Sequence, residues 1–176
     1  MAFTSPKTYS SGAVLTAADL NTYQRDNMDA VAPDGVQTRT FTPTLTASTT
    51  SPTLGSGSTA SGVATMLGNL AVVHIYVAFG SSGTNAGSGN YLLNWAALPS
   101  DFDAHATLVS SNFVTGSGYV RDSSAGDYWT VSCVANNSTS VRMVYTNATD
   151  NLVTDSLPHA WAANDSMKIC LSYVVA

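Results

Sequence analysis

Charged side chains are scarce in this chain of 176 residues. Asp, Glu, Lys and Arg together make up 10% of it, well below the roughly 25% found in ordinary soluble proteins. Acidic residues outnumber Lys and Arg by 11 to 6, which gives a formal net charge of −5. Such a chain lacks the basic field that attracts nucleic acid or an anionic membrane surface, so we expect neither as a partner.

Cysteine and long apolar runs are also rare. The two cysteines, Cys133 and Cys170, lie in separate apolar stretches. We expect them to be buried free thiols, with a disulfide between neighbouring strands as the alternative. The longest apolar run, Leu70 to Phe79, is too short to insert across a bilayer. Residues 1–7 lack the pattern of a secretory signal, which predicts a protein made in a cytoplasm that stays soluble.

Motifs for catalysis or metal binding are missing as well. The sequence contains no G-x-S-x-G, H-E-x-x-H or P-loop motif, each of which places a nucleophile, a metal or a phosphate at a fixed spacing. His74 lies in the middle of an expected strand as a structural residue, while His105 and His159 stand alone in loops. Asp101 and Asp103 fit a turn better than a calcium loop. We therefore predict no enzyme activity, no catalytic residue, no cofactor and no metal.

Uncharged polar residues supply the polarity that charge does not. Ser and Thr make up about a quarter of the chain, roughly double the usual level; Thr favours strands, and Ser, Gly and Asn favour turns. Alternating segments bounded by turn residues predict an all-β fold, an antiparallel, jelly-roll-like β-sandwich of about eight strands. The expected strands are residues 38–46, 70–79, 91–95, 106–110, 113–120, 128–135, 140–145 and 167–175.

Three segments have further features. Leu70–Phe79 is apolar on both faces, which predicts a central strand buried from two sides. Pro43 interrupts the first expected strand and so predicts an edge strand or a bulge. Residues 47–62 are dense in Ser, Thr, Gly and Pro, which predicts a long exposed loop with at most a short extended segment.

One helix precedes the strands. Thr16 and Asp19 have the spacing of a capping box, and apolar residues then recur at helical spacing as far as Val31. The apolar stripe is narrow, so this helix has to dock on the sandwich, on a copy of itself or on another protein. We therefore expect an N-terminal arm with an anchoring helix over residues 1–36 and a β-sandwich domain over residues 37–176.

Aromatic residues form the main candidate ligand surface. Rings stack on the faces of sugars and bury much area at a low entropy cost. The candidates for such surface contacts are Tyr119, Tyr128 and Trp129. Four further rings belong to the same candidate platform: Tyr91, Trp95, Tyr145 and Trp161. The alternative is that most of these rings are core or subunit contacts.

The N-terminal segment carries a family resemblance. Residues 9–31 read Tyr-Ser-Ser-Gly-Ala-Val-Leu-Thr-Ala-Ala-Asp-Leu-Asn-Thr-Tyr-Gln-Arg-Asp-Asn-Met-Asp-Ala-Val. Up to residue 35, this string resembles a segment near the N-terminus of many virion proteins of tailed bacteriophages, especially those that infect actinobacteria. Residues 51–58 are similar to them too, and residues 157–173 resemble their ending, in which Trp-Ala and Asp precede an aliphatic strand and Tyr.

The resemblance implies a structural protein assembled on the phage particle with other virion proteins, usually as a homotrimer. Leu20, Tyr23 and Met28 on the helix would then contact the particle or a neighbouring copy. Three functions stay open: a minor tail or appendage component that contacts the host surface, a capsid decoration protein that stabilises the head shell, and a carbohydrate-binding module for a cell-surface glycan.

Overall fold

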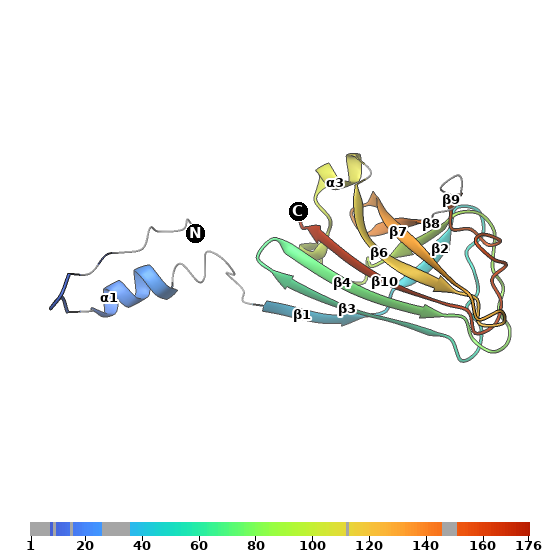
Figure 1. Ribbon diagram of the computed structural model, residues 1–176, viewed down its shortest axis with the longest axis horizontal. Coiled ribbons are helices and arrows are strands. Elements are labelled where there is room, and N and C mark those ends of the chain that lie inside the picture. The colour runs from blue at the N-terminus through green and yellow to red at the C-terminus, as the bar shows by residue number, and fades with distance from the viewer. Residues whose placement is uncertain (1–7, 9, 15, 26–35, 112, 146–150) are drawn as a thin grey trace.

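The computed structural model describes residues 8, 10–14, 16–25, 36–111, 113–145 and 151–176. In these ranges the chain forms a curled antiparallel β-sheet with few helices (Figure 1), which confirms the prediction of an all-β fold. The strands are β1 (Val36–Phe41), β2 (Thr44–Ala47), β3 (Thr59–Leu67), β4 (Leu70–Ala78), β5 (Tyr91–Asn94), β6 (Val114–Arg121), β7 (Tyr128–Asn137), β8 (Ser140–Tyr145), β9 (Asn151–Leu152) and β10 (Ser166–Val174). The helical segments are α1 (Ala17–Leu20), η1 (Asn21–Arg25), η2 (Ser100–Phe102) and α3 (Ala106–Ser110).

The two edges of the sheet meet at one corner of the chain. The strand order is β1-β3-β4-β10-β6-β7-β8-β5-β2, with β9 beside β8. β1 and β2 thus lie at opposite edges, although only Thr42 and Pro43 separate them in the sequence. The sheet therefore has to curl around a single core. Pro43 lacks a backbone N–H for pairing and breaks the strand at this corner, so the predicted edge position is confirmed.

The core lies inside the curled sheet and uses alternate residues of each strand. Along β10, Met167, Ile169 and Leu171 are buried, whereas Lys168 and Cys170 are exposed. Successive side chains of a strand point to opposite faces, so each strand contributes one face to the core. The other face is the outer surface of the body.

The prediction that Leu70–Phe79 is buried on both faces is wrong. Val73 and Val77 are fully buried on the inner face of β4, but His74 is exposed and Tyr76 is only half-buried on its outer face. β4 is central in the sheet, between β3 and β10, yet its outer face is open to solvent in the described part of the chain. His74 is therefore a surface residue rather than an enclosed structural one.

Residues 106–110 form the short helix α3, so the strand predicted there is wrong. The imidazole Nδ1 of His105 accepts a hydrogen bond from the backbone N–H of Thr107 at 3.2 Å. A five-residue segment of mixed polarity fits a helical turn as readily as a short strand. The cap from His105 satisfies one of the free N–H groups of that turn and so favours the helix.

The long exposed loop predicted for residues 47–62 also needs correction. Ala47 ends β2, and β3 begins at Thr59. Residues 48–58 lie against residues 79–90 through isolated bridges that join Thr50 to Ser88, Thr53 to Asn85, and Ser56 to Ser82. Small side chains let these two segments approach closely, and the same composition reads as a free loop from the sequence.

Gly87 provides a test of this pairing. Its φ is +71°, and a Cβ atom there would lie 2.1 Å from the backbone oxygen of Thr50, whereas Gly83 has a φ of +67° with nothing within 4 Å. We expect Gly87→Ala to lower the free energy of unfolding by about 2–4 kcal/mol, from backbone strain plus overpacking. Gly83→Ala should cost about 1 kcal/mol from strain alone. Urea denaturation measures both, and equal losses would contradict the close pairing.

The N-terminal helix begins with the predicted capping box. The Thr16 Oγ1 atom accepts a hydrogen bond from the backbone N–H of Asp19 at 3.1 Å, and Asp19 Oδ2 accepts one from the backbone N–H of Thr16 at 3.2 Å. α1 continues directly into η1, a π-helical turn. The expected continuation to Val31 lies outside the described residues. Figure 1 shows α1 to one side of the curled sheet, on the side where β1 begins.

Candidate functional site

A groove of about 450 Å³ crosses the outer face of the sheet over β3, β4, β10 and β6. Small-ligand sites commonly have volumes of roughly 300–1,000 Å³, so the groove is large enough for one. Each of its four strands has a hydrogen-bonded neighbour on both sides. The floor is therefore held by paired strands, which position side chains more precisely than loops do.

The strand register places a lysine between two tyrosines in this groove. Tyr76 on β4 lies opposite Lys168 on β10, and Lys168 lies opposite Tyr119 on β6. A second row across the same strands consists of His74, Cys170 and Ser117. The groove thus offers two rings, one ammonium group, one imidazole, one thiol and hydroxyl groups at its surface.

The rings and cations of this face form a continuous set of contacts. The Lys168 Nζ atom lies 5.4 Å from the ring centroid of Tyr76 and 6.0 Å from that of Tyr119, at the cation–π limit of about 6 Å. Tyr119 makes an edge contact with Tyr128 at 5.4 Å between centroids, and the Arg121 guanidinium carbon lies 5.6 Å from the Tyr128 centroid. We call these five residues the tyrosine–lysine strip.

The structure brings together two of the three predicted surface aromatics. Tyr119 and Tyr128 belong to the strip, but Trp129 pairs with the buried Val120 and so faces the inner side of the sheet. Its indole stacks on the imidazole of His159, with 4.9 Å between centroids and 12° between planes. The four further rings of the expected platform are buried in the core: Tyr91, Trp95, Tyr145 and Trp161.

Sequence reasoning missed Tyr76 and Lys168. A signal existed for Lys168, because it stands between Met167 and Ile169 and its strand alternates between buried and exposed residues. Alternation assigns Lys168 to the outer face. Alternation does not show that β4 and β6 flank β10, and this pairing is what brings the tyrosines to the lysine.

The predicted helix contacts are described only in part. Leu20 at the end of α1 is 40% exposed, which leaves its side chain available for a partner. The side chain of Tyr23 and the whole of Met28 lie outside the described residues. The assembly role of these three residues stays a prediction.

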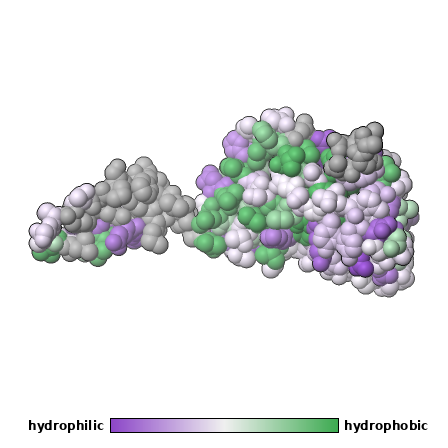
Figure 2. Space-filling view, viewed as in Figure 1, coloured by the Kyte–Doolittle hydropathy of each residue, from purple (hydrophilic) through white to green (hydrophobic). Residues whose placement is uncertain are grey.

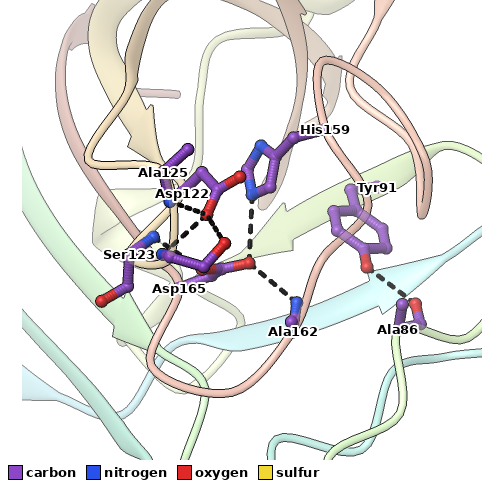
Figure 3. Close-up of polar contacts among 9 residues, drawn as sticks. Ala86, Tyr91, Asp122, Ser123, Ala125, His159, Ala162 and Asp165 are labelled. Carbon is purple, nitrogen blue, oxygen red and sulfur yellow. Dashed lines mark hydrogen bonds and ion pairs between the residues drawn. The ribbon is translucent and has the colours of Figure 1, made fainter.

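The other candidate site is a buried His–Asp pair (Figure 3). It lies in the segment before β10, which Figure 1 shows at the side of the sheet away from α1. His159 Nε2 is 3.1 Å from Asp165 Oδ2, and the two side chains are 6% and 1% exposed. Asp165 also accepts hydrogen bonds from the backbone N–H groups of Ser123 at 2.8 Å and Ala162 at 2.7 Å. The carboxylate joins the loop after β6 to the loop before β10, and a substrate has no access to it. We assign the pair a structural role.

The turn beside this pair is held by a second carboxylate. Asp122 Oδ1 accepts hydrogen bonds from the hydroxyl and backbone N–H of Ser124 and from the backbone N–H of Ala125 (Figure 3). These hydrogen bonds lower the pKa of Asp122 below its ordinary value, and the bond from the Ser124 hydroxyl has the largest effect. Bonds of this kind are typical of an Asx turn, so Asp122 also serves the fold.

Exposed apolar side chains form a rim at the end of the body away from the His159–Asp165 pair. Val36, Leu67, Leu70 and Val174 are neighbours across β1, β3, β4 and β10, and each is at least 46% exposed. Figure 2 shows hydrophobic side chains gathered at this end, which is the end nearest the N-terminal helix. Exposed apolar groups that adjoin one another mark contact surfaces more often than singly scattered ones do.

The two cysteines differ in accessibility. Both are free, as predicted, but Cys170 is exposed in the groove and only Cys133 is buried, so the prediction for Cys170 is wrong. Burial raises the pKa of the Cys133 thiol to about 12, and thiolates, not thiols, are the nucleophiles. We expect Ellman's reagent at pH 8 to titrate one thiol per native chain and two after denaturation. Cys170→Ser should reduce the native count to zero, and a rapid reaction of both native thiols would contradict the assignment.

The described ranges add two observations on other kinds of site. They hold no group of three or more His, Cys, Asp or Glu side chains placed to bind a metal ion. The same ranges contain no helix with the length and apolar character needed to cross a membrane. The groove is a place in them where several polar and aromatic side chains meet solvent.

The comparisons with known proteins include a structural similarity to a phage protein. No protein-family model matches the chain, and no curated protein matches it. Among solved structures, the chain is similar to the crystal structure of the Dettilon tailspike protein (gp208), with 22% sequence identity and a TM-score of 0.48. The match covers 78% of this chain and 23% of that chain, so this chain spans less than a quarter of that protein's length.

Proposed function

We propose that the chain is a non-enzymatic structural and binding protein of a bacteriophage particle, a minor tail or appendage component. Its N-terminal segment, residues 1–36, anchors it, and its sandwich, residues 37–176, presents the outer-face groove to a saccharide of the host surface. The observation that carries this proposal is the exposed Lys168 flanked by Tyr76 and Tyr119.

The composition of the groove supports a saccharide as its ligand. Tyrosine rings offer flat apolar faces with polar edges, and sugars present both an apolar ring face and many hydroxyl groups. Ser61 and Ser117 add exposed hydroxyls at the groove, each able to donate and accept hydrogen bonds. The strip therefore combines the two kinds of contact that a sugar needs.

Two features support assembly on a particle. Residues 9–35 resemble the N-terminal segment of tailed-phage virion proteins, and within this segment a capping box at Thr16 begins the helix α1. The apolar rim at the same end of the body offers further contact area. We propose that both serve attachment to other virion proteins and to further copies of the chain in a homotrimer.

Particle incorporation tests the anchoring part of this proposal. A phage that encodes the Leu20→Ser, Tyr23→Ser double variant should produce particles that lack the protein, while the variant remains folded in the lysate. Ala18→Ser, at an exposed position of α1, is the control and should be incorporated normally. Mass spectrometry of purified particles gives the copy number: few copies fit a tail component, and hundreds fit a capsid decoration protein instead. Particles that never contain the wild-type chain would overturn the proposal.

A further inference from the structure

We infer that the groove takes an acidic saccharide, one whose sugar ring carries a carboxylate, and that the Lys168 ammonium group binds this carboxylate. The inference rests on the proposed saccharide contact and specifies its ligand class. In the arrangement, Tyr76 and Tyr119 pack against the sugar on either side of the ion pair.

The charge of the groove differs in sign from that of the chain. The whole chain has a formal net charge of −5 and only six Lys and Arg residues. Two of these six, Lys168 and Arg121, belong to the tyrosine–lysine strip. Among the described residues, the groove lining contains Lys168 and no Asp or Glu. A local positive site on an acidic protein complements an anionic ligand.

Ring contacts surround the Lys168 ammonium group. It forms no ion pair within the described ranges, and its partners there are the two tyrosine rings. The rings stand on β4 and β6, which lie on either side of β10, so their strands are about 10 Å apart. Ring faces stabilise the ammonium group, but they leave its positive charge uncompensated. A carboxylate that enters the groove therefore gains a charge-assisted hydrogen bond.

The donors of the groove favour a carboxylate over a phosphate group. Phosphate sites usually combine several backbone N–H groups at a helix start with Arg side chains. Here the backbone of β10 is paired with β4 on one side and β6 on the other, and Arg121 stacks on Tyr128 outside the groove lining. One ammonium group matches the single charge of a carboxylate. In the part of the chain that the structure describes, hydroxyl groups join this lysine in the groove, and no Arg side chain or helix start does.

Saccharide binding by matched pairs of probes tests the inference. The probes are oligosaccharides that contain glucuronate or galacturonate, their methyl esters, and their neutral glucose or galactose counterparts, and binding is measured by calorimetry. The proteins are the wild-type chain and Lys168→Gln, Lys168→Arg and Arg39→Gln. Arg39 is exposed on β1, so Arg39→Gln removes one positive charge away from the groove and is the matched control.

We expect the wild type to bind a uronate probe and to lose at least about tenfold in affinity for its methyl ester. Lys168→Gln should lose at least the same factor for the uronate, with little change for the neutral counterpart. Lys168→Arg should retain most of the affinity, and Arg39→Gln all of it. Because the contact is ionic and exposed, the affinity should fall as salt rises. A melting curve for each variant confirms that it is folded.

The exposed thiol shows where the probe binds. Cys170 lies in the row next to Lys168, so a bound uronate should slow its reaction with Ellman's reagent. At a uronate concentration between the dissociation constants of the two proteins, the rate should change much less for Lys168→Gln, because most of its grooves are then unoccupied. Unaltered labelling of the wild type at saturating uronate would place the binding elsewhere and overturn the inference.

The remaining outcomes also decide the question. Binding of neutral saccharides as tight as that of uronates, or full affinity in Lys168→Gln, overturns the inference and leaves the proposed saccharide contact standing. No binding of any uronate overturns the inference, and no binding of any saccharide removes the groove from the proposed function as well. Particle incorporation is measured separately, so it distinguishes the loss of the ligand from the loss of the virion role.

Discussion

Asp165→Ala should lower the free energy of unfolding by about 3–5 kcal/mol, the usual cost of breaking a buried ionic or hydrogen-bonded pair by removing one partner. Asp165 is 1% exposed and accepts hydrogen bonds from the backbone N–H groups of Ser123 and Ala162. Alanine would leave both donors and the His159 ring without this acceptor in a region that excludes water. The measurement is urea denaturation followed by tryptophan fluorescence.

Asp127→Ala is the matched control for this substitution. Asp127 is exposed in the same turn region, and surface substitutions away from special contacts usually stay within about 0.5 kcal/mol. Asp165→Asn should have an intermediate effect, since its side-chain oxygen still accepts one hydrogen bond while its amide faces another donor. A loss for Asp165→Ala as small as that for Asp127→Ala would show that the carboxylate does not join the two loops.

Trp95→Ala should be about as costly, at about 3–5 kcal/mol. Trp95 is 2% exposed and stacks on Tyr173 with ring centroids 5.5 Å apart. Its indole Nε1 has no hydrogen-bond partner in the described part of the chain, so the substitution removes packing and leaves no polar group unsatisfied. The loss therefore reports the transfer of the ring from water and the cavity that remains.

The control for Trp95 is a large aromatic residue on the outer face. Tyr128 is 59% exposed, and Tyr128→Ala should change the free energy of unfolding by about 0.5 kcal/mol or less. Trp95→Phe should lie between the two, because it keeps most of the apolar contact. If Trp95→Ala and Tyr128→Ala cost the same, the inner and outer faces of the sheet have been assigned wrongly.

Local signals in the sequence predicted the elements that depend on neighbouring residues. The Thr16–Asp19 capping box needs only its own turn, and the structure contains it. The break at Pro43 follows from one missing N–H group. Period-two alternation also predicts on which face the β7 aromatics lie. Val131 and Cys133 are buried on β7, so Trp129, two residues before Val131, faces inward and Tyr128 faces outward.

Pairing between distant segments could not be predicted in the same way. The groove needs β4, β10 and β6 side by side, and no residue in any one of these strands specifies its neighbours. The Ser- and Gly-rich residues 48–58 look like a free loop until residues 79–90 lie against them. At Ala106–Ser110, a cap from His105 favours a helix where the pattern alone fits a strand. The groove and the paired loop thus depend on tertiary contacts, whereas the helix depends on a local cap that the alternation pattern does not contain.

The corner at Thr42–Pro43 determines how the body responds to a pull. For a protein held by its N-terminal segment, load enters through β1, which runs from the side where α1 lies (Figure 1) and pairs with β3 at six positions. The hydrogen bonds of antiparallel strands lie across the strand axis, so a pull along β1 loads them together in shear rather than one at a time. The corner then passes the load to β2 at the opposite edge. The β1–β3 ladder therefore resists tension on the N-terminal segment as a unit.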